Sequence, residues 1–584
     1  MTLRPPVVSL KVFVNYLPLP DAVSSLLVRW QVEDNLNLPD GFMLEFRDPD
    51  RDVLQKSGIT IGAPVKLTVL SSEDPAGDTL HEGEVTAVEA DQDSTGSSLL
   101  VRGWDKSHRL FRGRRTQTWD NATYSDVATR VAQRAGLMPG TIDSTSTTFD
   151  KVSQANATDW QFLNQLAGEI GYEVAVEDAQ LHFRKPASAG DAPSTGSTST
   201  TDPLQLTTST NLLRLRAVVT AAEQVSEVQV RAWDWRQKQP LIGTAPAATS
   251  SAQVSTDPAT LAGEFDPPPL IATTRPFGSQ SEVDGAAKAL AQDAGSPFAT
   301  LEGVALGSPK LRSGAPVSLG LVGDPFDGKY VLTSTRHRYD LEDGYTTAFT
   351  VSGRQDRSLL SLASAGTSAA SKAPAPMAGV APAIVTDLKD PEDLGRVKVK
   401  FPWLSDDYDT DWARLTQPGA GDGRGMVVMP EVGDEVLVAF EFGDVRRPYV
   451  IGSLYNGMDK PKQGDNLIDS SSGAVNRRGF VAKKGSSLIF FDSDEKEGIA
   501  LLSSDQNLRI SMDKTNTIIK ISSNGKVEIH ADQEITISAG TSMTLQAQSG
   551  IKIDSSGTLE LHGATVKIAS DGPLQAQGTP IQLN

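Results

Sequence analysis

The stretch from residue 519 to residue 561 reads IKISSNGKVEIHADQEITISAGTSMTLQAQSGIKIDSSGTLEL and repeats one pattern every eight residues. In each repeat two apolar side chains stand two positions apart, and polar residues separate them. Residues two apart on a β-strand face the same side, so each repeat is expected to form one short strand and one turn. The twelve apolar positions are Ile519, Ile521, Val527, Ile529, Ile535, Ile537, Met543, Leu545, Ile551, Ile553, Leu559 and Leu561.

One chain of this kind cannot enclose its own apolar face. Burying the twelve side chains would stabilise the fold by roughly 18–36 kcal/mol before the entropy of ordering is subtracted. The simplest closure is three identical chains, each contributing one strand per layer, so the repeat predicts a homotrimeric, triple-stranded β-helix over residues 515–584. A single-chain solenoid is the alternative, but its usual repeat of roughly 20 residues or more is longer than the one found here.

Composition removes several classes of function. The 584-residue chain is too long for one ordinary core, so at least three domains are expected. Its 54 basic and 73 acidic residues give a net charge of −19, which disfavours nucleic acid and anionic lipid as partners. The absence of cysteine excludes disulfides, thiolate zinc sites and cysteine nucleophiles. Neither a membrane-spanning helix nor a signal peptide is expected.

The region before the repeat is predicted to be mainly β with a minor α+β part. Period-two alternation suggests strands from residue 7 onward. Start and stop signals predict helices near 123–136 and 158–171, and a further helix is expected near 283–293. The domain prediction is two barrel-like parts over 1–361, a linker over 362–379, a small five-stranded barrel over 380–458 and a transition over 459–514, followed by the repeat.

Five motifs in the predicted small barrel carry a resemblance to a known family. They read DPEDLGRVKV at 390–399, FPW at 401–403, WAR at 412–414, PEVGDEVLV at 430–438 and GDVRRPYVIGSLYNG at 443–457. In this order they resemble the oligonucleotide/oligosaccharide-binding (OB) fold domain of VgrG-type spike proteins. The resemblance implies that the barrel is a collar between a hub and a needle.

The first part of the chain is similar to phage late control protein D, a tail hub protein. The similarity lies in TYSDVA at 123–128, DWQFLNQLA at 159–167, FDGKY at 326–330, HRYD at 337–340 and GYTT at 344–347. Together the two resemblances cover most of residues 1–460. The order of hub, OB collar and needle is the order found in the family.

The resemblance implies a structural hub-and-spike protein at the tip of a contractile injection system. It further implies contacts of the hub with inner tube and baseplate proteins, effector cargo as a candidate partner, and only transient mechanical contact with membrane. A PAAR-repeat tip protein would dock on Pro580, Ile581, Gln582, Leu583 and Asn584. Such a protein would be made in the bacterial cytoplasm and assembled into a particle that is either cell-associated or released.

An envelope-degrading enzyme or a glycan-binding module built on the same spike scaffold is the alternative function. The interval between collar and needle is too short for a catalytic domain of about 50 residues or more, and neither a nucleophile elbow nor a phosphate-binding loop is present. His81 lacks a second histidine four positions on, and His530 and His562 fall on the polar phase of the repeat. No catalytic residue, cofactor site or metal site is predicted.

Overall fold

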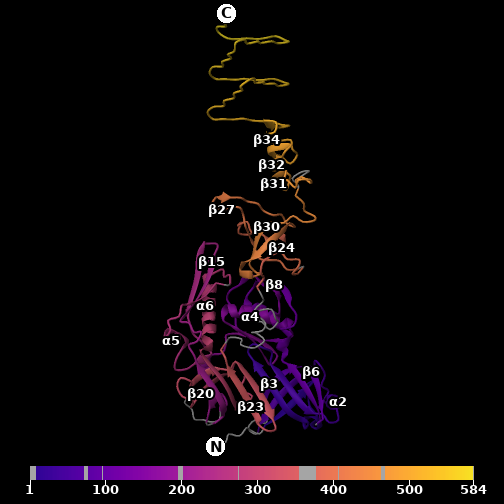
Figure 1. Ribbon diagram of the computed structural model, residues 1–584, viewed down its shortest axis with the longest axis vertical. Helices are drawn as coiled ribbons and strands as arrows, with labels where there is room; N and C mark the ends of the chain where they lie inside the picture. Colours follow the sequence, from indigo (N-terminus) through magenta and orange to yellow (C-terminus); the bar gives the residue numbers. More distant parts are fainter. Residues whose placement is uncertain are drawn as a thin grey trace. The chain divides into compact units, whose positions relative to one another are not determined.

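The computed structural model describes residues 8–71, 76–94, 96–194, 202–208, 210–273, 275–353, 376–405, 407–461 and 467–582. The chain forms two compact units, Met1–Asp459 and Lys460–Asn584. Most of the regular structure in the first unit is strand, and β31–β35 are the regular elements described in the second (Figure 1), which confirms the mainly β prediction. Among the described helices, none combines the length and the hydropathy that crossing a bilayer requires.

An 11-stranded sheet is the largest element of the first unit. Its order is β14-β19-β23-β22-β3-β4-β7-β6-β5-β1-β2. The strands span Val8–Val14 (β1), Leu17–Pro18 (β2), Leu27–Asn35 (β3), Gly41–Arg47 (β4), Pro64–Ser71 (β5), Asp78–Asp93 (β6), Gly96–Trp104 (β7), Leu212–Val219 (β14), Ala299–Leu306 (β19), Ser334–Asp340 (β22) and Gly344–Val351 (β23).

Two parts of residues 1–361, the predicted hub, meet in this sheet: a first half with β1–β7 and a second half with β14, β19, β22 and β23. The antiparallel β3–β22 pair sets Trp30 opposite Tyr339, although about 300 residues separate them. The Trp30 ring stacks on Tyr339 and lies 5.1 Å from the ring of Tyr345. The two sequence halves therefore share one hydrogen-bonded layer. Two short helices lie between strands of the first half along the chain: α1 (Asp21–Ser24) between β2 and β3, and α2 (Val53–Ser57) between β4 and β5.

A helical part lies between the two halves along the chain. Helix α3 (Tyr124–Arg134) and helix α4 (Asp159–Ile170) occupy the segments in which the sequence predicts helices. Each begins with a capping box, formed by Thr123 with Asp126 and by Thr158 with Gln161. Around them lie β8 (Arg115–Ala122), β9 (Met138–Ile142), β10 (Phe149–Ala157), β11 (Glu173–Glu177) and β12 (Gln180–Arg184).

A hairpin covered by a helix completes the hub. Strands β15 (Glu227–Asp234), β16 (Gln239–Pro246) and β18 (Leu270–Ala272) form one sheet, and α6 (Gln280–Gly295) packs on β15 and β16 (Figure 1). A Cβ at Gly243 would lie 2.3 Å from the Val283 carbonyl oxygen, so only glycine allows this close packing. The remaining elements are β13 (Gln205–Thr207), β17 (Ala252–Gln253), α5 (Pro258–Gly263), β20 (Pro316–Gly320) and β21 (Gly328–Val331).

The small barrel is built on a five-stranded sheet of order β25-β24-β29-β30-β26, the strand number that the sequence predicts. Its strands are β24 (Val380–Asp387), β25 (Lys398–Lys400), β26 (Arg414–Leu415), β29 (Glu435–Phe440) and β30 (Pro448–Ser453), with a short hairpin of β27 (Ala420–Gly421) and β28 (Arg424–Gly425). Val399, Phe401 and Val436 are fully buried in its core. Of the predicted linker, residues 362–375 lie outside the described residues.

The second unit begins with an antiparallel meander. Its strands are β31 (Arg477–Val481), β32 (Ser487–Ser493), β33 (Lys496–Leu502), β34 (Arg509–Asp513) and β35 (Ile518–Ser522), paired in chain order. The first repeat of the tail is thus a strand, β35. The later repeats up to residue 582 are extended but form no strand among the described residues (Figure 1). A strand needs a hydrogen-bonded neighbour, and one chain supplies none beyond Ser522.

Candidate assembly surfaces and a buried polar cavity

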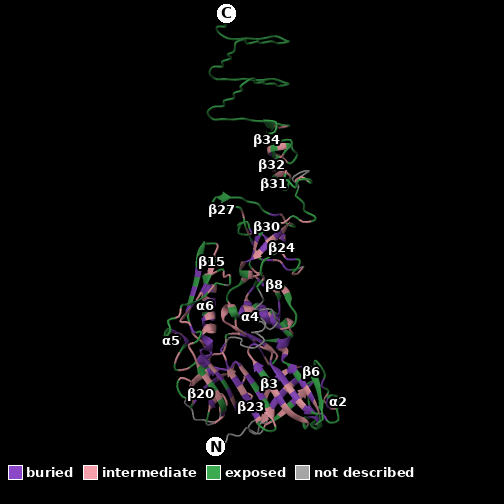
Figure 2. Ribbon diagram, viewed as in Figure 1, coloured by how far each residue is buried: buried purple, intermediate pink, exposed green. Residues whose placement is uncertain are grey.

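The twelve apolar positions of the repeat are all exposed in the single chain. Their exposed fractions run from 51% at Ile535 to 76% at Ile519, and the described tail after residue 523 is coloured as exposed in Figure 2. Val566 and Ile568, which continue the pattern, are 53% and 70% exposed. The chain therefore does not cover its own apolar stripe, which is where the sequence predicts contacts between copies.

The backbone of the tail also lacks partners within the chain. Among the described residues after Ser522, no backbone hydrogen bond joins one repeat to another. The contacts present are local, such as Gly525 N donating to Ser523 Oγ and Gly557 N donating to Ser555 Oγ. Extended segments with free amide and carbonyl groups pair readily with other strands. In the described part of the tail, neither the apolar side chains nor the backbone groups of one repeat are thus covered or paired by another repeat of the same chain.

The apolar stripe extends from the tail onto the meander. Pairing of β35 with β34 sets Ile519 opposite Met512 and Ile521 opposite Ile510, and β34 in turn pairs Ile510 with Leu501 of β33. Residues directly opposite share a face of the sheet. Ile510, Met512 and Leu501 are about half exposed. The sequence reasoning missed these positions, although the alternation in RISMD at 509–513 signals them.

The tip positions are described only in part. Pro580, Ile581 and Gln582 are exposed, with Ile581 at 50%. Leu583 and Asn584 lie outside the described residues. The described tip residues thus present one large apolar side chain to the surroundings.

An ion network holds the OB barrel on the helical part of the hub. Arg446 Nη2 lies 2.8 Å from a Glu169 carboxylate oxygen on α4 and 2.8 Å from Asp444. Tyr124 OH donates to Glu169 at 2.5 Å. Burial opposes the charge of Arg446, but Glu169 and Asp444 raise the pKa of its guanidinium. Hub and barrel are therefore joined by charges that stabilise one another away from water.

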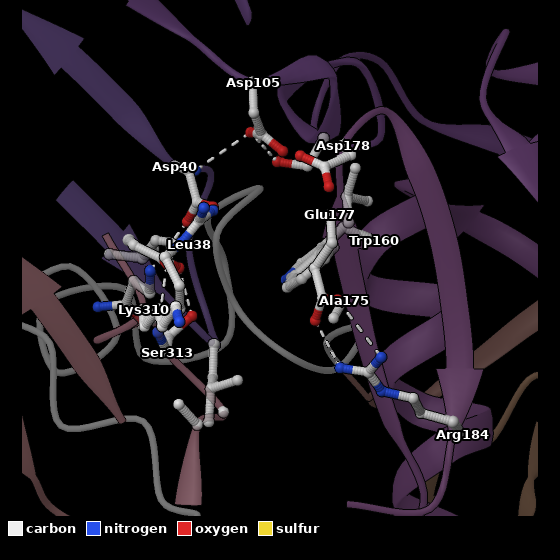
Figure 3. Close-up of a pocket in the computed structure, with 18 residues that line it drawn as sticks. Leu38, Asp40, Asp105, Trp160, Ala175, Glu177, Asp178, Arg184, Lys310 and Ser313 are labelled. Carbon is white, nitrogen blue, oxygen red and sulfur yellow. Dashed lines mark hydrogen bonds and ion pairs between the residues drawn. The ribbon is translucent and has the colours of Figure 1, made fainter. Parts of the chain in front are cut away.

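A polar cavity of about 390 Å³ lies where three parts of the hub meet. Figure 3 shows Asp40 and Asp105 on one side, with Glu177, Asp178 and Trp160 across the space. Asp40 N donates to Asp105 Oδ1 at 3.1 Å, and Ser107 Oγ donates to the same oxygen at 2.6 Å. The loop after β19 contributes Arg312. The cavity wall thus joins the first half, the second half and the helical part of the hub.

Burial decides how these carboxyl groups titrate. Loss of water raises the pKa of Asp105 to about 7 and raises the pKa of Asp40 well above its usual value. Burial acts in the same direction on Asp34, but the charge of Arg312, whose Nε lies 2.5 Å away, brings the pKa of Asp34 below its usual value. The ion pair of Asp34 with Arg312 thus joins β3 to the β19–β20 loop inside the fold.

Two histidines, His81 and His337, are buried in structural surroundings. His81 is 2% exposed, and burial lowers its pKa to about 3. His337 contacts the Tyr345 hydroxyl at 2.8 Å and the Leu311 carbonyl oxygen at 3.0 Å. His530 and His562 are exposed. Within the described ranges, no group of three or more histidine, aspartate or glutamate side chains could hold a metal ion.

Two protein-family models match parts of the first unit. Residues 381–455 match the model of the type VI secretion system/phage-baseplate injector OB domain. Residues 65–340 match the model of the Alg8 N-terminal domain. The first match covers the five-stranded barrel, and the second covers most of the hub.

Curated relatives include two type VI secretion system spike proteins. VgrG1c of Pseudomonas aeruginosa is 29% identical over 143 residues, which are 22% of this chain and 20% of that protein. VgrG3 of Vibrio cholerae is 39% identical over 69 residues, which are 11% of this chain and 7% of that protein. The chain therefore aligns with about a fifth or less of the length of these relatives.

A solved structure shares the fold over most of the chain. It is a Francisella PdpA–VgrG complex in a half-lidded state, with a TM-score of 0.53, 8% sequence identity and coverage of 88% of each chain. At this identity the likeness concerns the fold alone. In sequence, the chain is thus similar to VgrG-type spike proteins in and around its OB domain, and in fold it resembles the chain of the solved complex.

Proposed function

We propose that the chain is the hub-and-spike subunit of a contractile injection system and works as a homotrimer. The observation that carries this proposal is the exposure of the apolar side chains along the tail. Twelve apolar side chains, each more than half exposed, lie on a backbone that has no partner between repeats. Two further copies satisfy both needs at once, because their strands cover the stripe and pair with the free amides and carbonyls.

The needle so formed is stiff. Each layer is closed by a strand from each copy, and such a closed arrangement has no free lateral edge at which it could fray. The narrow axis suits the available side chains, since no Phe, Tyr or Trp occurs from residue 515 onward. Contraction of a sheath made of other proteins supplies the force, and the needle transmits it to the target envelope.

The hub provides the base of the needle and the start of the inner tube. Each chain contributes two halves to one sheet, joined at the β3–β22 pair, so three chains offer six halves on which a hexameric tube could begin. The Arg446–Glu169 network ties the OB barrel to the hub and opposes their separation under load. A PAAR-type tip protein would close the other end on residues 580–584.

Solution mass of the intact protein tests the proposal. The expected result is a particle of three times the mass of one chain. Ile537→Asp would place three carboxylates in one axial layer and should abolish the trimer, because a buried unpaired charge costs several kcal/mol. The matched control is Thr536→Asp, one position away on the polar phase, which should leave the trimer intact. A stable monomer of the unsubstituted chain, or equal trimer yields from the two variants, would refute the proposal.

A further inference from the structure

A charged groove in the first unit lies between the turn of the β15–β16 hairpin and the OB barrel. It encloses about 520 Å³. Seven cationic side chains line it against five acidic ones, although the chain as a whole carries a net charge of −19. A local excess of positive charge on so acidic a chain indicates a surface that attracts an anionic partner.

Strand register explains how the cations gather. An isolated bridge pairs Val397 with Ala413, and both side chains are buried in the barrel core. Because neighbouring residues on a strand face opposite sides, the residues that flank this bridge point out of the barrel. They are Arg396, Lys398, Trp412 and Arg414. The groove wall is thus the outer face of two adjacent strand segments.

Aromatic rings hold the two central cations in place. Lys398 Nζ lies 5.1 Å from the centre of the Trp412 ring. Arg414 Cζ lies 4.9 Å from the ring of Trp235, on the hairpin turn, and 5.6 Å from the ring of Tyr449. A cation that already rests on a ring loses less side-chain freedom when it binds an anion.

Lys398 and Arg414 differ from the neighbouring cations because their charges are not balanced by an ion pair within the described residues. Arg236 and Arg396 both pair with Glu392, at 2.7 and 3.0 Å. In contrast, no carboxylate in the described part of the chain forms an ion pair with Lys398 or Arg414. Arg414 is exposed and Lys398 is half-buried. Two positioned charges are therefore available for a ligand.

We propose that this groove binds an acidic peptide segment of a partner protein, with two carboxylates spaced two residues apart. Lys398 and Arg414 are diagonal cross-strand neighbours, for which the spacing is about 7–8 Å. Alternate residues of an extended peptide are about 6.6–6.8 Å apart and face the same way. Trp233, which is 52% exposed, lies in the same groove and offers an apolar contact. Recognition of acidic motifs by clustered cations is a common mode of peptide binding.

Other anions fit less well. A nucleic acid or other polyanion would be repelled by the net charge of the chain, which the small local excess does not offset. A glycan would stack on aromatic rings, but cations already lie over two of the three tryptophan rings in the groove, those of Trp235 and Trp412, which leaves only the ring of Trp233. The site goes beyond the proposed needle function and does not depend on it.

The test is binding of a short fluorescein-labelled peptide with glutamate at every second position to the full-length protein, followed by fluorescence anisotropy. Saturable binding that weakens with added salt is expected. Lys398→Gln and Arg414→Gln should each weaken binding roughly fivefold, the effect of one partly exposed ion pair. Lys288→Gln, on the exposed side of α6 and outside the groove, should leave it unchanged. Thermal melts of each variant establish that it is folded.

Three results would overturn the inference. The first is the absence of saturable binding in a sample whose mass is that of the assembled protein, which would mean that a sister copy covers the groove. The second is equal binding by the two groove variants and the control. The third is tighter binding of an acidic polysaccharide such as polygalacturonate than of the peptide. None of these results would bear on the oligomeric state, which is measured separately.

Discussion

The OB barrel and the tail share a similar alternation of apolar and polar residues, yet their apolar side chains lie in opposite environments. In the barrel, Val399 and Val436 are fully buried by strands of the same chain. In the tail, Ile529 and Leu561 are each 70% exposed. The difference lies in the connections. The barrel strands are linked by turns that bring them back onto one another, whereas each repeat of the tail continues onward without returning. One pattern of side chains therefore yields either a closed domain or an open assembly surface.

The largest expected effect is a loss of stability in the OB barrel. Phe401→Ala should lower the free energy of unfolding of the barrel by about 3–5 kcal/mol, because it leaves a cavity among Trp403, Tyr408 and Phe440. Chemical denaturation followed by tryptophan fluorescence measures this loss. The mass in solution should stay unchanged. Dissociation into single chains would show that the barrel core also belongs to the assembly surface.

A smaller effect is expected at the junction of hub and barrel. Arg446→Met removes the cation shared by Glu169 and Asp444 and should destabilise the first unit by about 2–3 kcal/mol, since it leaves two partly buried carboxylates without a partner. Arg424→Met, on the exposed β28, is the control. The measurement is the thermal midpoint of the first unit, and equal midpoints for the two variants would contradict the role assigned to Arg446.

The buried carboxyl groups of Asp40 and Asp105 make stability depend on pH. The folded-state pKa of Asp105 is about 7, whereas its usual value is 3.8. Between these values the folded chain holds a proton that the unfolded chain has lost, so the free energy of unfolding falls as pH rises through this window. Asp105→Asn should flatten that slope and raise stability at neutral pH. Asp40, whose pKa is shifted in the same direction, would retain part of the slope.

Denaturation curves across the pH window measure this effect. Asp91→Asn, an exposed carboxyl group on β6, is the control and should keep the slope of the unsubstituted protein. An Asp105→Asn protein with an unchanged slope would show that Asp105 stays ionised in the folded hub.

The smallest expected effect is local to one helix. Thr158→Ala removes the side chain that accepts from Gln161 N at 3.1 Å at the start of α4. The loss should be about 1 kcal/mol, as is usual for a helix N-cap. Thermal unfolding of the first unit measures it. A loss similar to that of Phe401→Ala would mean that α4 is coupled to the barrel more strongly than its capping contact implies.

Local signals in the sequence were sufficient for elements whose physics is local. The capping residues Thr123 and Thr158 marked the starts of α3 and α4, and the left-handed Gly171 marked an end. Period-two alternation indicated strands from residue 7 onward, and β1 begins at Val8 in the structure. The eight-residue period of the tail also needs no tertiary information, since it depends only on which side each residue of a strand faces.

Long-range pairing decided the rest. The β3–β22 contact, the cluster of Asp34, Asp40 and Asp105, and the groove around Lys398 and Arg414 each bring together residues that are far apart in the chain or on separate strands. The sequence by itself determined that an apolar stripe runs along the tail, because side-chain direction on a strand is a local property. Only the tertiary structure decided that the barrel strands bury one another's apolar side chains while those of the tail stay exposed. Burial depends on which distant segments of the chain come into contact, and the sequence pattern does not specify those contacts.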